Sequence, residues 1–102
     1  MMTVFKYPLS FVGLPVVNLP EGAQILHVDM QYGLPVLWAL IDEANKDKLK
    51  PRYIRIAGTG HDIESASHDT EIPKDFSGIR YINTFFANEE RSLVYHAFEV
   101  IL

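Results

Sequence analysis

The chain has 102 residues, of which 48% are hydrophobic and 22% charged, and its formal net charge is −4. These values are typical of one soluble globular domain spanning residues 1–102, and they exclude a disordered tail and a fibrous repeat. The acidic balance argues against duplex nucleic acid and anionic membranes as partners, and the absence of cysteine removes disulfides and thiol nucleophiles and favours the cytoplasm.

Two short segments bounded by proline open the chain. Thr3 to Leu9 contains Pro8, and Val16 to Leu19 lies between Pro15 and Pro20. Proline cannot donate to a strand ladder and is therefore confined largely to edge strands. Both segments are predicted to be edge strands.

The next two segments predict a β-hairpin. From Gln24, apolar or aromatic residues occupy alternate positions, which is the pattern of a strand with one face in water. Gly33 permits a tight reversal, and residues 34–41 are then apolar on both faces. We expect residues 34–41 to form a central strand covered on each side, with Trp38 in the core.

The second half of the chain predicts three further strands. A charged segment, residues 42–50, fits one helical turn or a loop, and residues 52–57 alternate as a strand. The long segment 62–78 has no period and is expected to be a surface connection. Residues 79–86 and 93–102 then predict a second hairpin around a polar turn.

These elements predict a mainly β fold. We expect an antiparallel sandwich or partly open barrel of about six or seven strands, with at most one short helix. Apolar residues continue to Leu102, and one Trp, five Tyr and six Phe are many for so small a core. We therefore expect the apolar end to be buried and the chain to form a homo-oligomer, most simply across a two-fold axis.

Several sequence segments spread over most of the chain form a distinctive set. They are FKYPL at 5–9, LPEGAQILHV at 19–28, LWALID at 37–42, GTGH at 58–61, Tyr81-Ile82, Thr84-Phe85 and HAFE at 96–99. The set resembles a family of small uncharacterised proteins encoded by phages and prophages. The resemblance implies a phage origin and an accessory role, and it supplies no active site. Tyr32-Gly33 stands where Asn-Gly would be expected, which leaves the type of the hairpin turn open.

The loop Gly58-Thr59-Gly60-His61 is a candidate anion site. Two glycines let backbone N–H groups converge, and Thr59 and His61 offer further donors. The loop lacks the GxGxxG spacing of a dinucleotide loop and the lysine of a P-loop, so a plain glycine turn at the end of a strand is the alternative.

Arginines near this loop extend the candidate site. Arg55 and Arg80 are predicted to pair with an anionic ligand, and Tyr53 or Tyr81 to stack on a base. The alternative is that these arginines are ordinary surface charges that balance the thirteen acidic residues.

The histidines do not indicate a metal or a cofactor. His27, His61, His68 and His96 match no metal-binding spacing, and no serine stands in a nucleophile elbow. We therefore expect no metal, no cofactor and no enzymatic activity.

Three functions remain open at this point. The first is a phage accessory protein that sequesters a small anionic, nucleotide-like signal of the host as an anti-defence device. The second is an inhibitor that binds a host protein through an aromatic patch or an exposed edge strand, without a small ligand. The third is a small hydrolase using His61 with Asp62 or Asp69.

Overall fold

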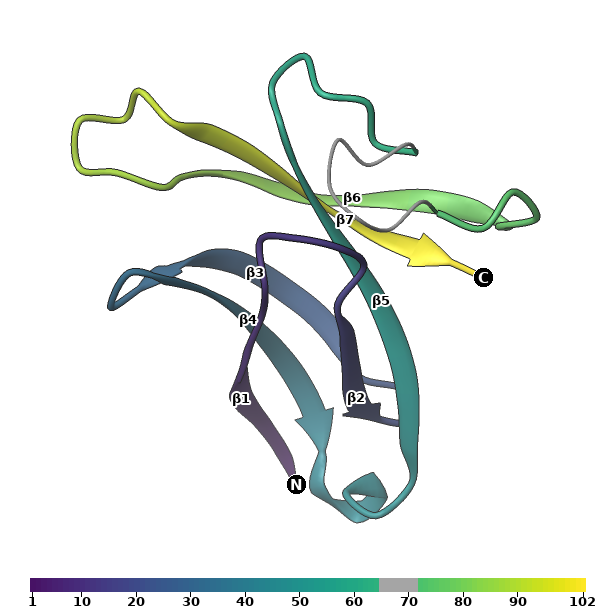
Figure 1. The fold of residues 1–102 in the computed structure, drawn as a ribbon. Coiled ribbons are helices and arrows are strands. Elements are labelled where there is room, and N and C mark those ends of the chain that lie inside the picture. The colour runs from purple at the N-terminus through teal and green to yellow at the C-terminus, as the bar shows by residue number, and fades with distance from the viewer. Residues whose placement is uncertain (65–71) are drawn as a thin grey trace.

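The computed structural model describes residues 1–64 and 72–102 (Figure 1), and these residues are mainly β. The strands are β1 (Met2–Pro8), β2 (Val16–Pro20), β3 (Gln24–Gln31), β4 (Leu34–Asp42), β5 (Leu49–Gly58), β6 (Gly78–Phe86) and β7 (Val94–Ile101). One short 3-10 helix, η1 (Glu43–Asn45), joins β4 to β5, and it is the only helix in the described parts of the chain.

The strands form two antiparallel sheets. One sheet has the order β1-β4-β3 and the other has the order β2-β5-β7-β6. Two hairpins, β3–β4 and β6–β7, extend side by side from the body and diverge toward their tips (Figure 1). The predicted fold class was a mainly β antiparallel sandwich or partly open barrel of about six or seven strands. It is confirmed, and the described residues form the sandwich, with seven strands.

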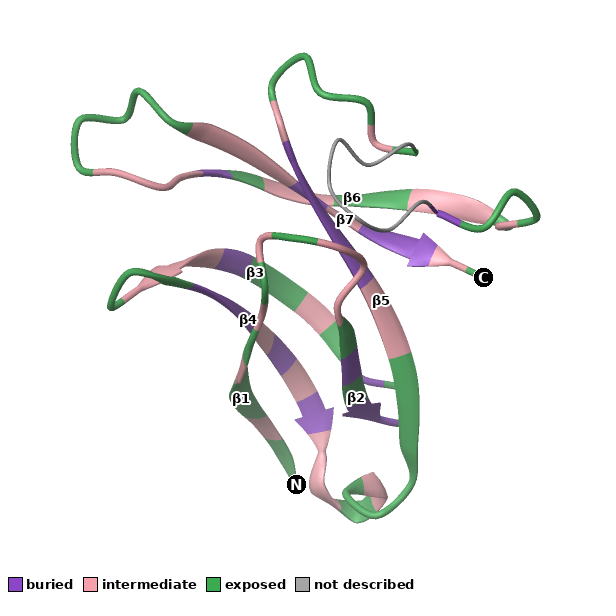
Figure 2. Cartoon of the chain, in the orientation of Figure 1, coloured by how far each residue is buried: buried purple, intermediate pink, exposed green. Residues whose placement is uncertain are grey.

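The core lies between the two sheets, where each strand contributes its apolar alternate residues. Leu19, Leu37 and Ile54 are completely buried, and Val28 and Ala97 complete the contact between sheets. Burial follows β4, β5 and β7 and ends before the hairpin tips (Figure 2). Alternation with a period of two therefore identifies the inward face of most strands.

Three local predictions need correction. Trp38 is only half-buried, because it lies on the outer face of β4 while Leu37 points to the core. β5 starts at Leu49 rather than Arg52 and includes Pro51, which is tolerated because β5 pairs only with β2 there, and with β7 only from Tyr53 onward. At the C-terminal end Val100 is buried, but Leu102 is 51% exposed.

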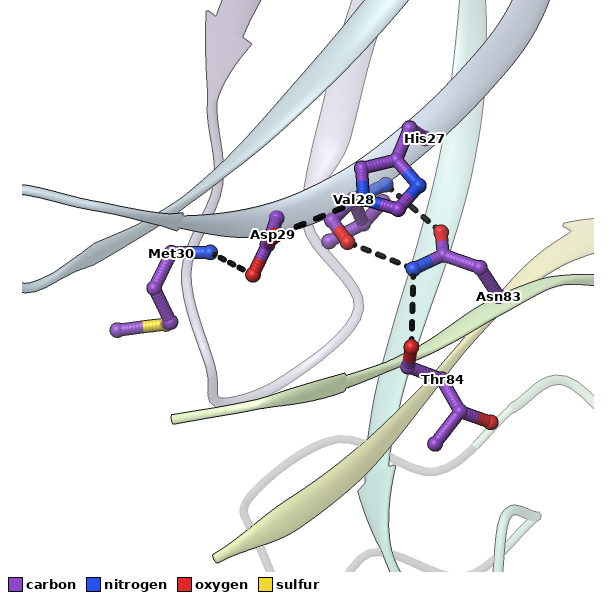
Figure 3. A network of polar contacts seen from close by, with 6 residues as sticks. All are labelled: His27, Val28, Asp29, Met30, Asn83 and Thr84. Carbon is purple, nitrogen blue, oxygen red and sulfur yellow. Dashed lines mark hydrogen bonds and ion pairs between the residues drawn. The ribbon is translucent and has the colours of Figure 1, made fainter. Parts of the chain in front are cut away.

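One side-chain amide joins the two sheets (Figure 3). Asn83 on β6 accepts a hydrogen bond from the Val28 N–H at 2.7 Å and donates to the Val28 carbonyl at 2.8 Å. Val28 lies on β3, an edge strand of its sheet, and β6 is an edge strand of the other sheet. The amide thus pairs the two edges as a peptide group would, and it fixes where the two hairpins lie relative to each other.

Candidate binding clefts

The predicted loop at 58–61 is a tight turn that uses its own glycines. The His61 N–H donates to the Gly58 carbonyl at 3.0 Å, and Gly60 has φ +84°, which favours glycine. A Cβ on Gly58 would lie 2.9 Å from the His61 ring. Both glycines are therefore required by the turn and by the packed imidazole, without reference to a ligand.

The Thr59 hydroxyl belongs to a chain of hydrogen bonds. Thr59 Oγ1 lies 2.8 Å from His96 Nε2, and His96 Nδ1 lies 2.9 Å from Thr84 Oγ1. Thr84 Oγ1 in turn lies 2.8 Å from the Tyr81 hydroxyl. Thr59 and Tyr81, two predicted site residues, are thus linked through His96, which sequence reasoning did not place in the site.

Arg55 is buried and hydrogen-bonded within the fold. It is 3% exposed, and its Nη1 donates to the Gly13 carbonyl at 2.6 Å in the connection between β1 and β2. Burial lowers the pKa of Arg55 from its ordinary value. Tyr53, two residues earlier on β5, is half-buried. An anion bound by Arg55, Thr59 and His61 stays a prediction, and it would have to compete with these intramolecular contacts.

Arg80 lies apart from this group, in an ionic cluster with Glu99 and Arg52. Arg52 forms a two-pronged ion pair with Glu99 through Nε and Nη2, and its Nη1 donates to the Ala23 carbonyl at 2.9 Å. Glu99, which hydrogen-bonds Arg52, raises the pKa of that arginine. Arg80 Nη1 lies 3.9 Å from Glu99 Oε1. No sequence pattern indicated that Glu99 would be the centre of this cluster.

A wide cleft lies between the two hairpins. Its volume is about 750 Å³. The β3–β4 hairpin lines one wall with His27, Asp29, Met30, Tyr32 and Gly33, and the β6–β7 hairpin lines the other with residues 84–89 and Arg91. Sequence reasoning placed no site here, because the two walls come from different sheets.

Each wall of this cleft carries charges. On β3, His27 Nε2 lies 3.6 Å from Asp29 Oδ2, and both side chains are about half exposed. Asp29 also accepts the Met30 N–H at 2.7 Å, which fixes the carboxylate near the cleft (Figure 3). On the facing hairpin, the Arg91 guanidinium lies 4.7 Å from the centre of the Phe86 ring. The cleft therefore offers cationic, anionic and aromatic groups together.

Tyr32 stands at the tip of the β3–β4 hairpin. It is 94% exposed and has φ +52°, and Gly33 follows with φ +79°. Two consecutive positive φ values identify a type I′ turn, in which Asn-Gly is the preferred pair. The turn predicted from Gly33 is confirmed, and its first position holds a large aromatic residue in a strained conformation.

Metal-binding clusters and membrane-spanning helices are both absent from the described residues. The described residues contain no cluster of three or more histidine, cysteine or acidic side chains that could hold a metal. No helix in the described segments could span a membrane. Asp69, named in the hydrolase hypothesis, and His68, one of the four histidines, lie outside the described residues.

Comparison with known proteins gives a family. No curated protein and no solved structure matches the chain. A family described as a domain of unknown function, DUF7352, matches residues 1–101. The chain therefore belongs to this uncharacterised family.

Proposed function

We propose that this is a non-enzymatic binding protein that holds a segment of a partner protein in the cleft between its two hairpins. The observation that carries the proposal is the cleft of about 750 Å³ whose rim bears the 94% exposed ring of Tyr32. Tyrosine and arginine are enriched among the residues that dominate binding energy at protein interfaces. Both occur here, as Tyr32 and Arg91.

Exposed apolar side chains favour a protein over a small ligand. Besides Tyr32, Leu34 at the start of β4 is 61% exposed and Leu93 beside β7 is 51% exposed. Small ligands bind mostly in pockets that enclose them, whereas a partner protein also covers the apolar rim of an open cleft. These side chains therefore fit a partner that extends past the cleft.

The charges of the cleft would select the partner. His27 and Asp29 form one wall, and Glu89 and Arg91 lie on the other. A segment carrying both signs of charge would match this arrangement, and charge complementarity contributes more to specificity and association rate than to affinity.

The resemblance to phage and prophage proteins extends the proposal. The resemblance supports a partner protein in the host cell, which the chain would bind and block. The role of the chain would then be anti-defence or another form of inhibition. Phage origin and cytoplasmic location belong to the proposal as well.

A peptide selection followed by one variant tests the proposal. Peptides from a random library are selected on the immobilised protein, and the affinity of an enriched peptide is measured by fluorescence anisotropy. Tyr32→Asn removes the ring but suits the positive φ, so the fold is kept. We expect about a tenfold loss of affinity, as for loss of an aromatic anchor.

A matched variant removes an exposed ring elsewhere. Phe5 on β1 is 46% exposed and does not line the cleft. Phe5→Ala should leave the affinity unchanged. Equal affinity of Tyr32→Asn and the unaltered protein, or failure to enrich any peptide, would contradict the proposal.

A further inference from the structure

The ionic cluster around Glu99 contains one more cation than it needs. The Glu99 side chain is 5% exposed and receives two hydrogen bonds from Arg52. A buried carboxylate needs one cationic partner to balance its charge, and an arginine that donates two hydrogen bonds is the strongest partner of this kind. Arg52 alone therefore compensates Glu99.

Arg80 brings the surplus charge. Its side chain is 70% exposed, and its contact with Glu99 is at 3.9 Å, longer than a hydrogen bond. An exposed ion pair at this distance adds little to stability. The Arg80 guanidinium thus keeps its hydrogen-bonding capacity for another acceptor.

The cluster is placed between two hollows. One, of about 370 Å³, is lined by residues 23–25 of the β3 region, by residues 80–82 of β6, and by Arg52 and Glu99. The other, of about 360 Å³, is lined by the same three charged residues and the ends of β5 and β7. Arg80 borders both hollows, and Gln24 adds an amide to the first.

We propose that the first hollow binds a small oxyanion, a phosphate or carboxylate group, through Arg80. The guanidinium fork of Arg80 matches the paired oxygens of such a group. Arg52 is held in place by Glu99 and the Ala23 carbonyl, and its charge is balanced by Glu99, so Arg80 supplies the net positive charge of the hollow. This site shares no residue with the hairpin cleft, so it stands independently of the proposed function.

Titration with inorganic phosphate, followed by amide NMR spectra at constant ionic strength, tests the proposal. Constant ionic strength removes general screening from the comparison. We expect saturable shifts at Gln24, Ile25 and Ile82. Arg80→Gln should weaken binding about tenfold, as expected for loss of a charge-assisted hydrogen bond, and Arg80→Lys should recover part of the loss.

Lys6→Gln is the control for net charge. Lys6 lies on β1, which β4 separates from β3, and its substitution removes the same single charge. It should leave phosphate binding unchanged. Equal weakening by Lys6→Gln and Arg80→Gln, shifts confined to residues 58–61, or no saturable binding would each overturn the proposal.

Discussion

Asn83 shows how one residue can replace part of a strand ladder. Its amide satisfies both the N–H and the carbonyl of Val28 on the free edge of β3. A register shift in the β6–β7 pairing just before Asn83 leaves an extra residue on β6, the signature of a β-bulge. Bulges redirect side chains, and here the redirected amide closes one side of the sandwich.

Asn83→Ala should lower the free energy of unfolding by about 1 to 3 kcal/mol, because it leaves two polar groups of Val28 without their partner. Urea denaturation measures the effect. Asn18→Ala on β2 is the control, since Asn18 is exposed. A loss no greater than that of Asn18→Ala would show that the amide does not stabilise the join.

At the scale of elements, the backbone of the β3–β4 turn is strained, and a different residue at position 32 would reduce the strain. Tyr32 has φ +52° in a turn type for which Asn is favoured. A left-handed backbone costs a residue with a large side chain roughly 1 kcal/mol more than Asn or Gly. Strain of this kind often accompanies function, which agrees with the role proposed for the Tyr32 ring.

Tyr32→Asn should therefore raise the free energy of unfolding by up to about 1 kcal/mol, measured by the same denaturation. Gly33→Ala, at φ +79°, should lower it. Destabilisation by Tyr32→Asn would mean that the exposed ring makes stabilising contacts and that the turn is not strained.

Most elements could be predicted because their signals are local. Alternation located β3, β6 and β7, Gly33 located the first turn, and proline marked the ends of β2. The start of β5 could not be predicted in this way, because whether Pro51 is tolerated depends on which neighbours β5 has at that end. The prediction that Trp38 lies in the core was wrong for a related reason. An apolar face of a strand can be left partly exposed if no other element of the chain packs on it.

At the scale of the whole molecule, the sites depend on contacts between distant segments. The hairpin cleft combines residues 27–33 with residues 84–91, and the cluster of Arg52, Arg80 and Glu99 combines three strands. No local sequence pattern indicates that these segments are in contact. The sequence did identify Arg80 and Tyr81 as candidates, but it associated Arg80 with Arg55 and the glycine turn instead of with Glu99.

The predicted homo-oligomer also belongs to this scale and stays a prediction. Several large apolar side chains of the three-stranded sheet are exposed: Met2, Val4 and Phe5 on β1, and Leu26 on β3. Contact with a second copy would cover such side chains. The hairpin cleft is built within one copy, so the proposed binding does not require the oligomer.

The central claim, that the hairpin cleft is the binding site, is tested most directly by blocking it. Because the chain has no cysteine, Glu89→Cys provides a single attachment point on the cleft wall for a bulky maleimide. Lys48→Cys, on the exposed connection after η1, is the labelled control. We predict that the selected peptide no longer binds the labelled Glu89→Cys protein but binds the labelled Lys48→Cys protein normally. Equal binding by both labelled proteins would contradict the account.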